Sequence, residues 1–112
     1  MTAFDASLLP ASATVDGAGH ASIGGVRLSV IAAQFGTPCY VYDEAEIRAR
    51  CRAYQSVFGA GATAYASKAF LCIAMTRIVQ EEGLHLDVAT GGELFVAMRA
   101  GFDPEHIVFH GN

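Results

Sequence analysis

ATAYASKAFLCIAMTRIVQEEGLHLDVATGGELFVAMRAGFDPEHIVF, residues 62–109, alternates short apolar runs with longer amphipathic ones, which predicts three strands separated by two helices. The strands fall at residues 62–66, 84–89 and 107–109, and the helices at 70–82 and 93–100. Gly83 and Gly101 follow the helices, where glycine favours a helix end. Strands joined by helices pair in parallel through crossover connections. The segment therefore predicts an α/β fold, either an open doubly wound sheet or a (β/α)8 barrel.

Signals of regular structure are weaker in the first third of the chain. Residues 1–18 are rich in Ala, Ser, Thr and Gly without periodicity, so we expect a stretch that is loose or held only by other parts of a longer protein. Two short apolar runs, 20–23 and 26–28, flank a Gly-Gly pair, which predicts a small antiparallel or edge element. Ser29 is then placed to cap a brief helix over residues 30–35, closed by a glycine.

A strand and a helix are predicted just before the alternating segment. Residues 39–42 form an alternating apolar run after Pro38, which predicts a strand. Asp43 precedes a helical apolar pattern and Glu46 lies three residues later, the spacing of a capped helix start. The pattern places this helix at residues 44–57, with one apolar face and one solvated, charged face.

Composition narrows the class of protein. The 112 residues carry a formal net charge of −4, and their seven Lys and Arg form no basic stripe, so we expect no nucleic-acid partner. Hydrophobic residues make up 53% of the chain, yet no apolar run approaches the roughly 18 residues that cross a bilayer. No secretory signal opens the chain. We therefore expect a soluble, cytoplasmic protein with no membrane partner.

Cysteines and histidines give no sign of a disulfide framework or a metal centre. The cysteines contain no C-x-x-C pair and are interpreted as small buried apolar residues of a reduced compartment. The histidines show no i, i+4 pairing with a carboxylate ligand between or beyond them, so we predict no metal site. The residues concerned are Cys39, Cys51, Cys72, His20, His85, His106 and His110.

The end of the chain predicts a fragment. Residues 107–112 have the pattern of a strand that stops where a loop should begin, so we expect a longer protein. A small α/β binding module complete at 112 residues is the alternative, but its last strand would have no following helix to cover it.

Polar side chains follow each of the three predicted strands. Ser67 and Lys68 follow the first, residues 87–93 extend from the second, and residues 110–112 follow the third. Because the carboxyl ends of parallel strands meet at one edge, these clusters should converge. A lysine at that edge can act as a nucleophile toward an aldehyde, although a lysine that opens a helix is often a solvated surface residue.

The second cluster contains the most informative carboxylate. Asp87 lies inside an apolar strand, where an unpaired carboxylate is costly, so it should have a partner or line a polar cavity. Gly91 and Gly92 either cradle an anion at the start of the next helix or make a plain turn. Glu93 suits the positive end of that helix.

Four sequence blocks resemble one family of enzymes. Residues 65–70, YASKAF, resemble the signature around the cofactor lysine of the fold-type III pyridoxal-phosphate decarboxylases. Residues 86–94 (LDVATGGEL), 107–112 (IVFHGN) and 36–43 (GTPCYVYD) are similar to blocks of the diaminopimelate decarboxylases. The blocks occur in the family's order and extend the resemblance over residues 23–112.

The resemblance implies the amino-terminal part of a pyridoxal-phosphate-binding (β/α)8 barrel that begins near Thr37. Residues 37–112 would form its first βα units, and residues 1–36 would contribute to a β-rich second domain completed by a distant carboxyl-terminal part. We expect the chain alone to be inactive and poorly folded, because three parallel strands without barrel closure leave apolar faces and sheet edges uncovered.

The resemblance also implies a reaction and its residues. Lys68 would form the Schiff base with pyridoxal 5'-phosphate, and Asp87, Glu93, His110 and Asn112 would lie near the cofactor. The implied reaction converts meso-2,6-diaminopimelate into L-lysine and CO2, the last step of lysine biosynthesis. The phosphate loop, the partner of the pyridine nitrogen and the substrate-binding groups are implied to lie outside this sequence, in a homodimeric enzyme.

Other functions within the same fold remain as alternatives. A related decarboxylase would act on ornithine, arginine or a carboxylated polyamine, whereas a carrier protein would bind pyridoxal phosphate without catalysis. A regulatory relative would have lost activity. The H-G-N block and the G-T-P block favour the diaminopimelate decarboxylases. Lys68 argues against a lysine-free relative, and the β-rich signal at residues 20–36 argues against a carrier.

Overall fold

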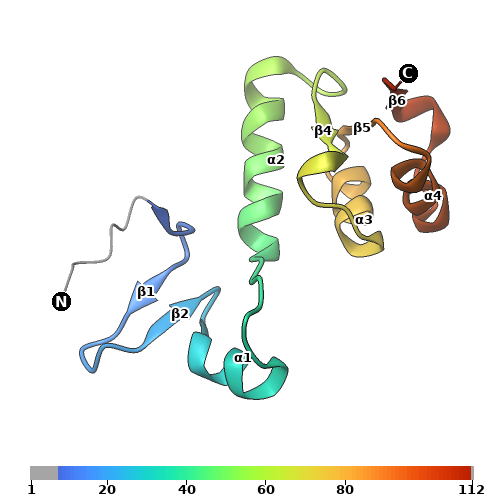
Figure 1. Cartoon of the computed structure of the whole chain (residues 1–112). Helices are drawn as coiled ribbons and strands as arrows, with labels where there is room; N and C mark the ends of the chain where they lie inside the picture. Colours follow the sequence, from blue (N-terminus) through green and yellow to red (C-terminus); the bar gives the residue numbers. More distant parts are fainter. Residues whose placement is uncertain (1–7, 112) are drawn as a thin grey trace. The chain divides into compact units, whose positions relative to one another are not determined.

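The computed structural model describes residues 8–111, in two parts that are divided between Ile47 and Arg48 and are described separately (Figure 1). Helix α2 (Glu44–Phe58) contains the division. Helices alternate with parallel strands in the second part, so the predicted α/β class is confirmed.

The first part holds a small antiparallel sheet with the strand order β1-β2-β3. Its strands are β1 (Thr14–Val15), β2 (Ala21–Ile23) and β3 (Val26–Arg27). Pairing of β2 with β3 confirms the predicted antiparallel element. Strand β1 corrects the expectation of a loose stretch for residues 8–18, whereas residues 1–7 lie outside the described residues. Asp16 accounts for the strand, because its carboxylate accepts hydrogen bonds from the backbone N–H groups of Ala18 (3.0 Å) and His20 (2.9 Å) and so closes the turn into β2.

Helix α1 (Leu28–Phe35) begins directly after β3. The predicted start at Val30 behind a Ser29 cap is therefore wrong. Arg27 occupies the cap position in an extended conformation without a side-chain cap, because the strand runs into the helix with no intervening loop. The predicted end is confirmed, since Gly36 has a φ of 81° and its N–H donates to the carbonyl of Ala32.

The predicted strand at residues 39–42 is wrong, because this stretch is irregular. A strand needs a neighbour for its backbone groups, and neither sheet in the described part of the chain pairs with it. Tyr40 is 92% exposed, so the alternating apolar pattern here does not report a buried face.

Asp43 begins helix α2 as predicted. Its Oδ1 accepts hydrogen bonds from the backbone N–H groups of Ala45 (2.9 Å) and Glu46 (3.4 Å). The Ser12 hydroxyl donates to the other carboxylate oxygen, and this bond is the largest cause of a lowered pKa at Asp43. The start of α2 is thus tied to a residue 31 positions earlier.

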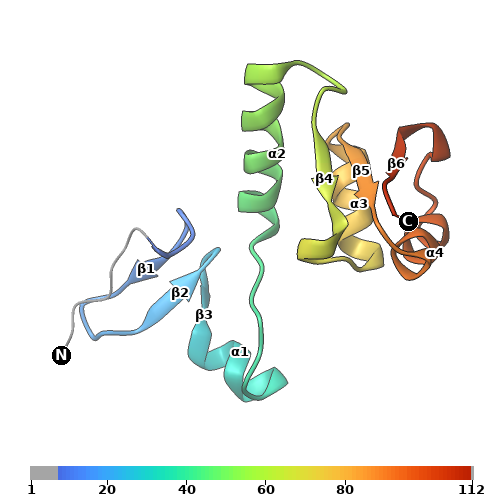
Figure 2. The same ribbon diagram turned by 45° about the horizontal axis from the view of Figure 1, so that its top comes forward.

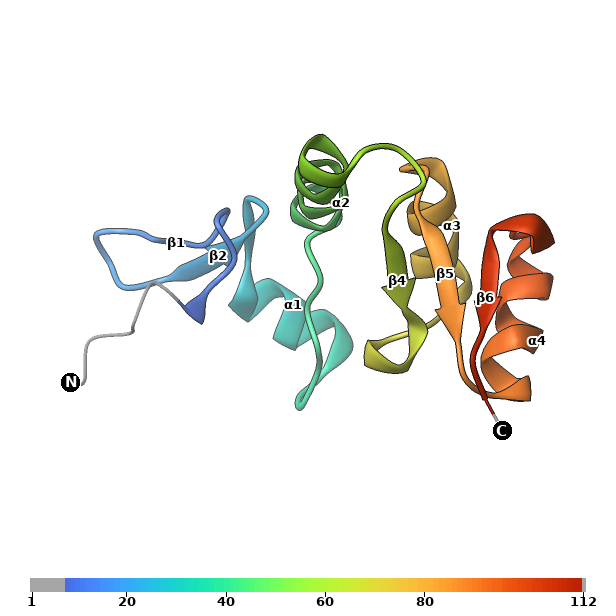
Figure 3. The same ribbon diagram turned by 90° about the horizontal axis from the view of Figure 1, so that it is seen from above.

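The second part holds a parallel sheet with the strand order β4-β5-β6 (Figures 2 and 3). The strands are β4 (Ala64–Ala66), β5 (His85–Val88) and β6 (Ile107–Phe109). Helices α3 (Ile73–Glu81) and α4 (Gly91–Ala100) connect them and lie on one face of the sheet. Short 3-10 turns, η2 (Ser67–Ala69) and η3 (Pro104–His106), complete the part. The predicted order of strands and helices is confirmed.

Helix α3 begins three residues after its predicted start at residue 70. The turn η2 is followed by extended backbone that reaches Cys72, whose Sγ accepts a hydrogen bond from the Met75 N–H and caps the helix. Helix α4 begins at Gly91, two residues before its predicted start. Its predicted end at a glycine is confirmed, because Gly101 has a left-handed conformation with a φ of 78°.

The apolar core lies between the sheet and helices α3 and α4. Leu86 and Val88 of β5 are fully buried, together with Val79 of α3 and Ala97 of α4. Successive residues of a strand face opposite sides of the sheet. Asp87, which lies between the two buried residues of β5, therefore faces the side away from these helices.

The three cysteines are free, but they are not alike. Cys51 is buried, and burial raises the pKa of its thiol. Cys72 is half-buried and Cys39 is exposed, so the interpretation of all three as buried apolar residues is wrong for Cys39. Its position in the irregular stretch before α2 accounts for the exposure.

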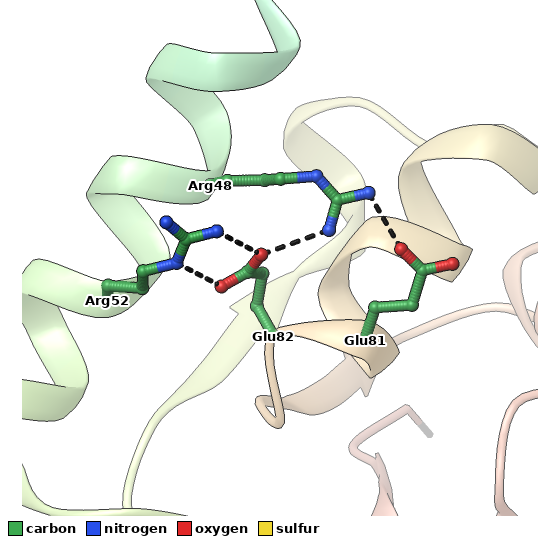
Figure 4. A network of polar contacts seen from close by, with 4 residues as sticks. All are labelled: Arg48, Arg52, Glu81 and Glu82. Atoms are coloured by element: carbon green, nitrogen blue, oxygen red, sulfur yellow. Dashed lines mark hydrogen bonds and ion pairs between the residues drawn. The ribbon is translucent and has the colours of Figure 1, made fainter.

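An ion-pair network joins helix α2 to the end of α3 (Figure 4). Arg52 donates two hydrogen bonds to the Glu82 carboxylate, at 2.7 and 2.9 Å. Arg48 donates to Glu82 at 3.0 Å and to Glu81 at 2.7 Å. Arg52 and then Arg48 lower the pKa of Glu82 to about 2. The face of α2 that was expected to be solvated therefore binds its neighbour.

We expect Glu82→Gln to destabilise the protein above pH 4.5 and to have progressively less effect as the pH falls toward 2. The pKa of Glu82 is lowered from 4.5 to about 2 in the folded state, so its ionisation contributes stability that is lost across this window. Urea unfolding midpoints measured across the window test this. Glu81→Gln removes one bond of the network and is the matched control, with a smaller effect. A difference between wild type and Glu82→Gln that stays constant with pH would contradict the assignment.

Candidate functional site

The polar clusters predicted at three strand ends do meet at one edge of the parallel sheet. Ala66, Asp87 and Val108 are aligned across β4, β5 and β6. Lys68 lies two residues after Ala66, and His110 lies two residues after Val108. The two residues therefore follow the strands on either side of β5, at the carboxyl end of the sheet (Figure 3 shows the order of the strands).

Lys68 lies in the turn η2, directly after β4. Its side chain is exposed and forms no hydrogen bond or ion pair with residues 8–111. The Tyr65 hydroxyl donates to the carbonyl of Phe70 at 2.8 Å and so closes the turn around the lysine. Lys68 is also the single lysine among the 112 residues, because the other six cationic side chains are arginines. It is thus the amine of this sequence that can form a covalent bond with an aldehyde.

Ser67 provides a buried hydroxyl beside this lysine. The residue is 3% exposed, and its Oγ has no hydrogen-bond partner of normal geometry in the described part of the chain. It lies near enough to the Glu93 carboxylate to contribute, as the smallest cause, to the lowered pKa of Glu93. A buried hydroxyl with an incomplete set of partners is uncommon, which makes Ser67 a candidate site residue.

Asp87 and His110 form a hydrogen-bonded pair between β5 and the end of β6. The contact joins Asp87 Oδ1 to His110 Nδ1, and it confirms the prediction that Asp87 has a partner. The His110 backbone N–H donates to the carbonyl of Val88 at 2.9 Å, which extends the pairing of the two strands. The aspartate side chain is 25% exposed and the imidazole 55% exposed, so both are accessible from this edge.

Thr90 and Glu93 form a reciprocal cap at the start of α4. The Thr90 hydroxyl accepts from the Glu93 N–H at 3.2 Å, and Glu93 Oε2 accepts from the N–H groups of Ala89 (2.7 Å) and Thr90 (2.9 Å). The bond from Ala89 is the largest cause of the lowered pKa of Glu93. Gly91 and Gly92 form the first turn of the helix behind this cap.

We expect Thr90→Ala to lower the free energy of unfolding by about 1 kcal/mol, because it removes the acceptor for an N–H group at the helix start. Thr90→Ser keeps the hydroxyl and is the matched control. Thermal or urea unfolding of the two variants compares them directly. Equal loss of stability in both would show that the hydroxyl bond is not the source of the effect.

The structure brings together only some of the sequence-predicted site residues. The structure brings Asp87 and His110 into contact, whereas Lys68 contacts neither of them. Glu93 contacts the backbone of the loop that precedes α4. Asn112 lies outside the described residues.

Two features of this edge were missed from the sequence. The cap of Thr90 was readable, since threonine followed three residues later by glutamate is the spacing of a capping box. The burial of Ser67 had no readable signal. Within residues 8–111, no group of three or more His, Cys, Asp or Glu is arranged to hold a metal ion, and no helix is long and apolar enough to span a membrane.

Similar sequences are found among pyridoxal-dependent enzymes. Residues 44–112 match the family model described as pyridoxal-dependent decarboxylase, pyridoxal binding domain. The chain is 50% identical over 104 residues to the diaminopimelate decarboxylase of Mycobacterium tuberculosis strain H37Rv, covering 92% of this chain and 23% of that protein. It is 52% identical over 98 residues to the diaminopimelate decarboxylase of Bacillus subtilis strain 168, covering 84% and 22%.

Solved structures with the same fold agree with these relatives. The AQ1208 protein of Aquifex aeolicus matches with a TM-score of 0.83 and 36% identity, covering 90% of this chain and 26% of that chain. The diaminopimelate decarboxylase of M. jannaschii in co-complex with L-lysine matches with a TM-score of 0.75 and 30% identity, covering 92% and 25%. The chain thus spans about a quarter of the length of the proteins that it matches.

Proposed function

We propose that this chain, which belongs to the family of pyridoxal-dependent decarboxylases, forms part of the cofactor-binding barrel of a diaminopimelate decarboxylase. The observation that supports this most directly is the position of its single lysine. Lys68 follows the carboxyl end of β4, without a partner in residues 8–111, and the neighbouring strand β5 carries the Asp87 carboxylate that contacts His110. Residues 37–112 would belong to the barrel and residues 1–36 to a β-rich domain.

The residues at this edge fit pyridoxal phosphate. An unengaged lysine amine can bind the aldehyde of the cofactor covalently. The Asp87–His110 pair places a carboxylate and an imidazole at the ends of the neighbouring strands β5 and β6. The buried Ser67 hydroxyl, which lacks a partner of normal geometry within residues 8–111, adds a further donor beside the lysine.

In the proposed reaction each side chain has a limited task. Pyridoxal phosphate, when bound, supplies the electron sink for loss of CO2 from the α-carbon of the substrate. Lys68 would hold the cofactor through its Nζ amine and would carry a proton at that atom. Asp87 and Glu93 would lie near the cofactor, Glu93 while holding the loop before α4, and His110 would line the same edge of the sheet. Asn112 is proposed as a cofactor contact on the family resemblance alone.

The remainder of the site would come from the rest of a longer protein. The phosphate-binding groups, the partner of the pyridine nitrogen and the substrate-binding groups are proposed to lie outside these 112 residues. We propose a cytoplasmic homodimer that forms L-lysine, and we expect this chain alone to be inactive.

Release of CO2 from carboxyl-labelled meso-2,6-diaminopimelate by the full-length protein with pyridoxal phosphate tests the proposal. We expect turnover of this substrate, with L-lysine as the product, and much slower release from ornithine and arginine. Faster release from ornithine or arginine would show that the proposed substrate is wrong. Cofactor binding without CO2 release from any of the three would indicate a carrier protein instead of an enzyme.

A further inference from the structure

His110 contacts Asp87 through one nitrogen of its ring. Nδ1 meets Asp87 Oδ1, and Asp87 Oδ2 has no partner in residues 8–111. A histidine that donates from Nδ1 to a carboxylate fixes both the ring orientation and the direction of that carboxylate. The arrangement therefore determines where the second oxygen of Asp87 points, on the side of the sheet away from α3 and α4.

Gly111 explains how the imidazole reaches this position. A Cβ on Gly111 would overlap the carbonyl oxygen of Ala89, which is backbone and not the end of a flexible side chain. That backbone is itself held, because the Ala89 N–H donates to Glu93. The chain after β6 can thus pass close to the chain after β5 only where residue 111 has no side chain.

We propose that His110 is a positioning residue that directs the Asp87 carboxylate toward the ligand bound at Lys68, and that Gly111 permits this contact. The inference rests on the proposed function and deepens it. Asp87 is aligned with Ala66, two residues before Lys68, so its carboxylate lies at the strand end that carries the lysine. His110 acts through Asp87 and need not touch the ligand itself.

Substitution of His110 by asparagine or by glutamine distinguishes the role of Nδ1 from that of Nε2. The asparagine amide can replace the donor at Nδ1, whereas the longer glutamine amide reaches the position of Nε2. The absorbance spectrum of bound pyridoxal phosphate is the readout, because a charged group near the cofactor changes its electronic state. We expect Asp87→Asn to shift the visible band of the full-length protein. His110→Ala and His110→Gln should reproduce that shift, and His110→Asn should retain the wild-type spectrum.

Two further variants complete the test. In the Asp87→Asn background, His110→Ala should add no further shift, since both changes remove the same interaction. Gly111→Ala should shift the band as His110→Ala does, whereas Gly17→Ala, at a glycine with nothing within 4 Å of an added Cβ, should leave it unchanged.

Three results would overturn the inference: a wild-type spectrum in Asp87→Asn, rescue by glutamine instead of asparagine, or an additive shift in the double variant. If the Lys68-dependent band is unchanged by substitution of Asp87 and of His110, the positioning role is rejected and the proposed function is not. A wild-type protein without any lysine-dependent band would reject both.

Discussion

Lys68→Ala in the full-length protein is expected to abolish both decarboxylation and covalent attachment of pyridoxal phosphate. Alanine has no amine, so the variant lacks the nucleophile for the cofactor aldehyde at this strand end. Lys68→Arg keeps the positive charge and most of the side-chain length, but the guanidinium stays protonated and is not a nucleophile. We therefore expect arginine to be as inactive as alanine, which separates covalent chemistry from charge.

Arg77→Ala is the matched control for this prediction. Arg77 is an exposed cation on α3, away from the strand ends, so its removal should leave activity and cofactor binding near wild type. Rates of CO2 release and the visible absorbance of each purified variant provide the measurements. Substantial activity in Lys68→Arg would contradict the covalent role and indicate that the charge of this residue is what matters.

Leu86→Ala is expected to cost about 2–5 kcal/mol of unfolding free energy, the range for removing a large buried aliphatic side chain. Leu86 is fully buried in the central strand, in the core that the sheet forms with α3 and α4. The loss combines reduced burial of apolar surface with the cavity that remains. Urea unfolding of the full-length protein, followed by a probe of this region, measures it.

Leu8→Ala makes the same chemical change at a leucine that is 81% exposed, so we expect an effect within about 0.5 kcal/mol. Equal destabilisation by the two substitutions would contradict the described core. A large loss at Leu86 with intact cofactor binding would show that the core and the site can be disturbed separately.

The alternation of strands and helices after residue 60 could be predicted because it is written in local patterns. Apolar runs of strand length alternate with amphipathic stretches that end at glycines, and such patterns leave few ways to pair the strands. The stretch at residues 39–42 does not form the structure that its local pattern predicts. Its composition suits a strand, but a strand also needs a neighbour, and the sequence does not reveal whether one is present.

The candidate site could be predicted in part. The cost of an unpaired carboxylate inside a strand was enough to predict that Asp87 has a partner. The identity of that partner depends on the register between β5 and β6, which brings residue 110 to residue 87. The close approach of Gly111 to Ala89 depends on the same register and has no local signal.

Helix starts were predicted less well for a related reason. Apolar periodicity extends into the residues that precede a helix, whereas the first turn is determined by the capping residue. Cys72 is a weak and unusual cap, so the start of α3 had no clear signal. The cap at Thr90 was readable, and it would have placed the start of α4 at the correct residue.

Reductive trapping of the cofactor tests the central claim most directly. The full-length protein, loaded with pyridoxal phosphate and treated with borohydride, would be digested and its peptides analysed by mass spectrometry. We predict that the mass of the reduced cofactor is found on the peptide that contains Lys68 and on no other. Attachment to a different lysine, or an unmodified Lys68 in a protein that still decarboxylates meso-2,6-diaminopimelate, would contradict the account.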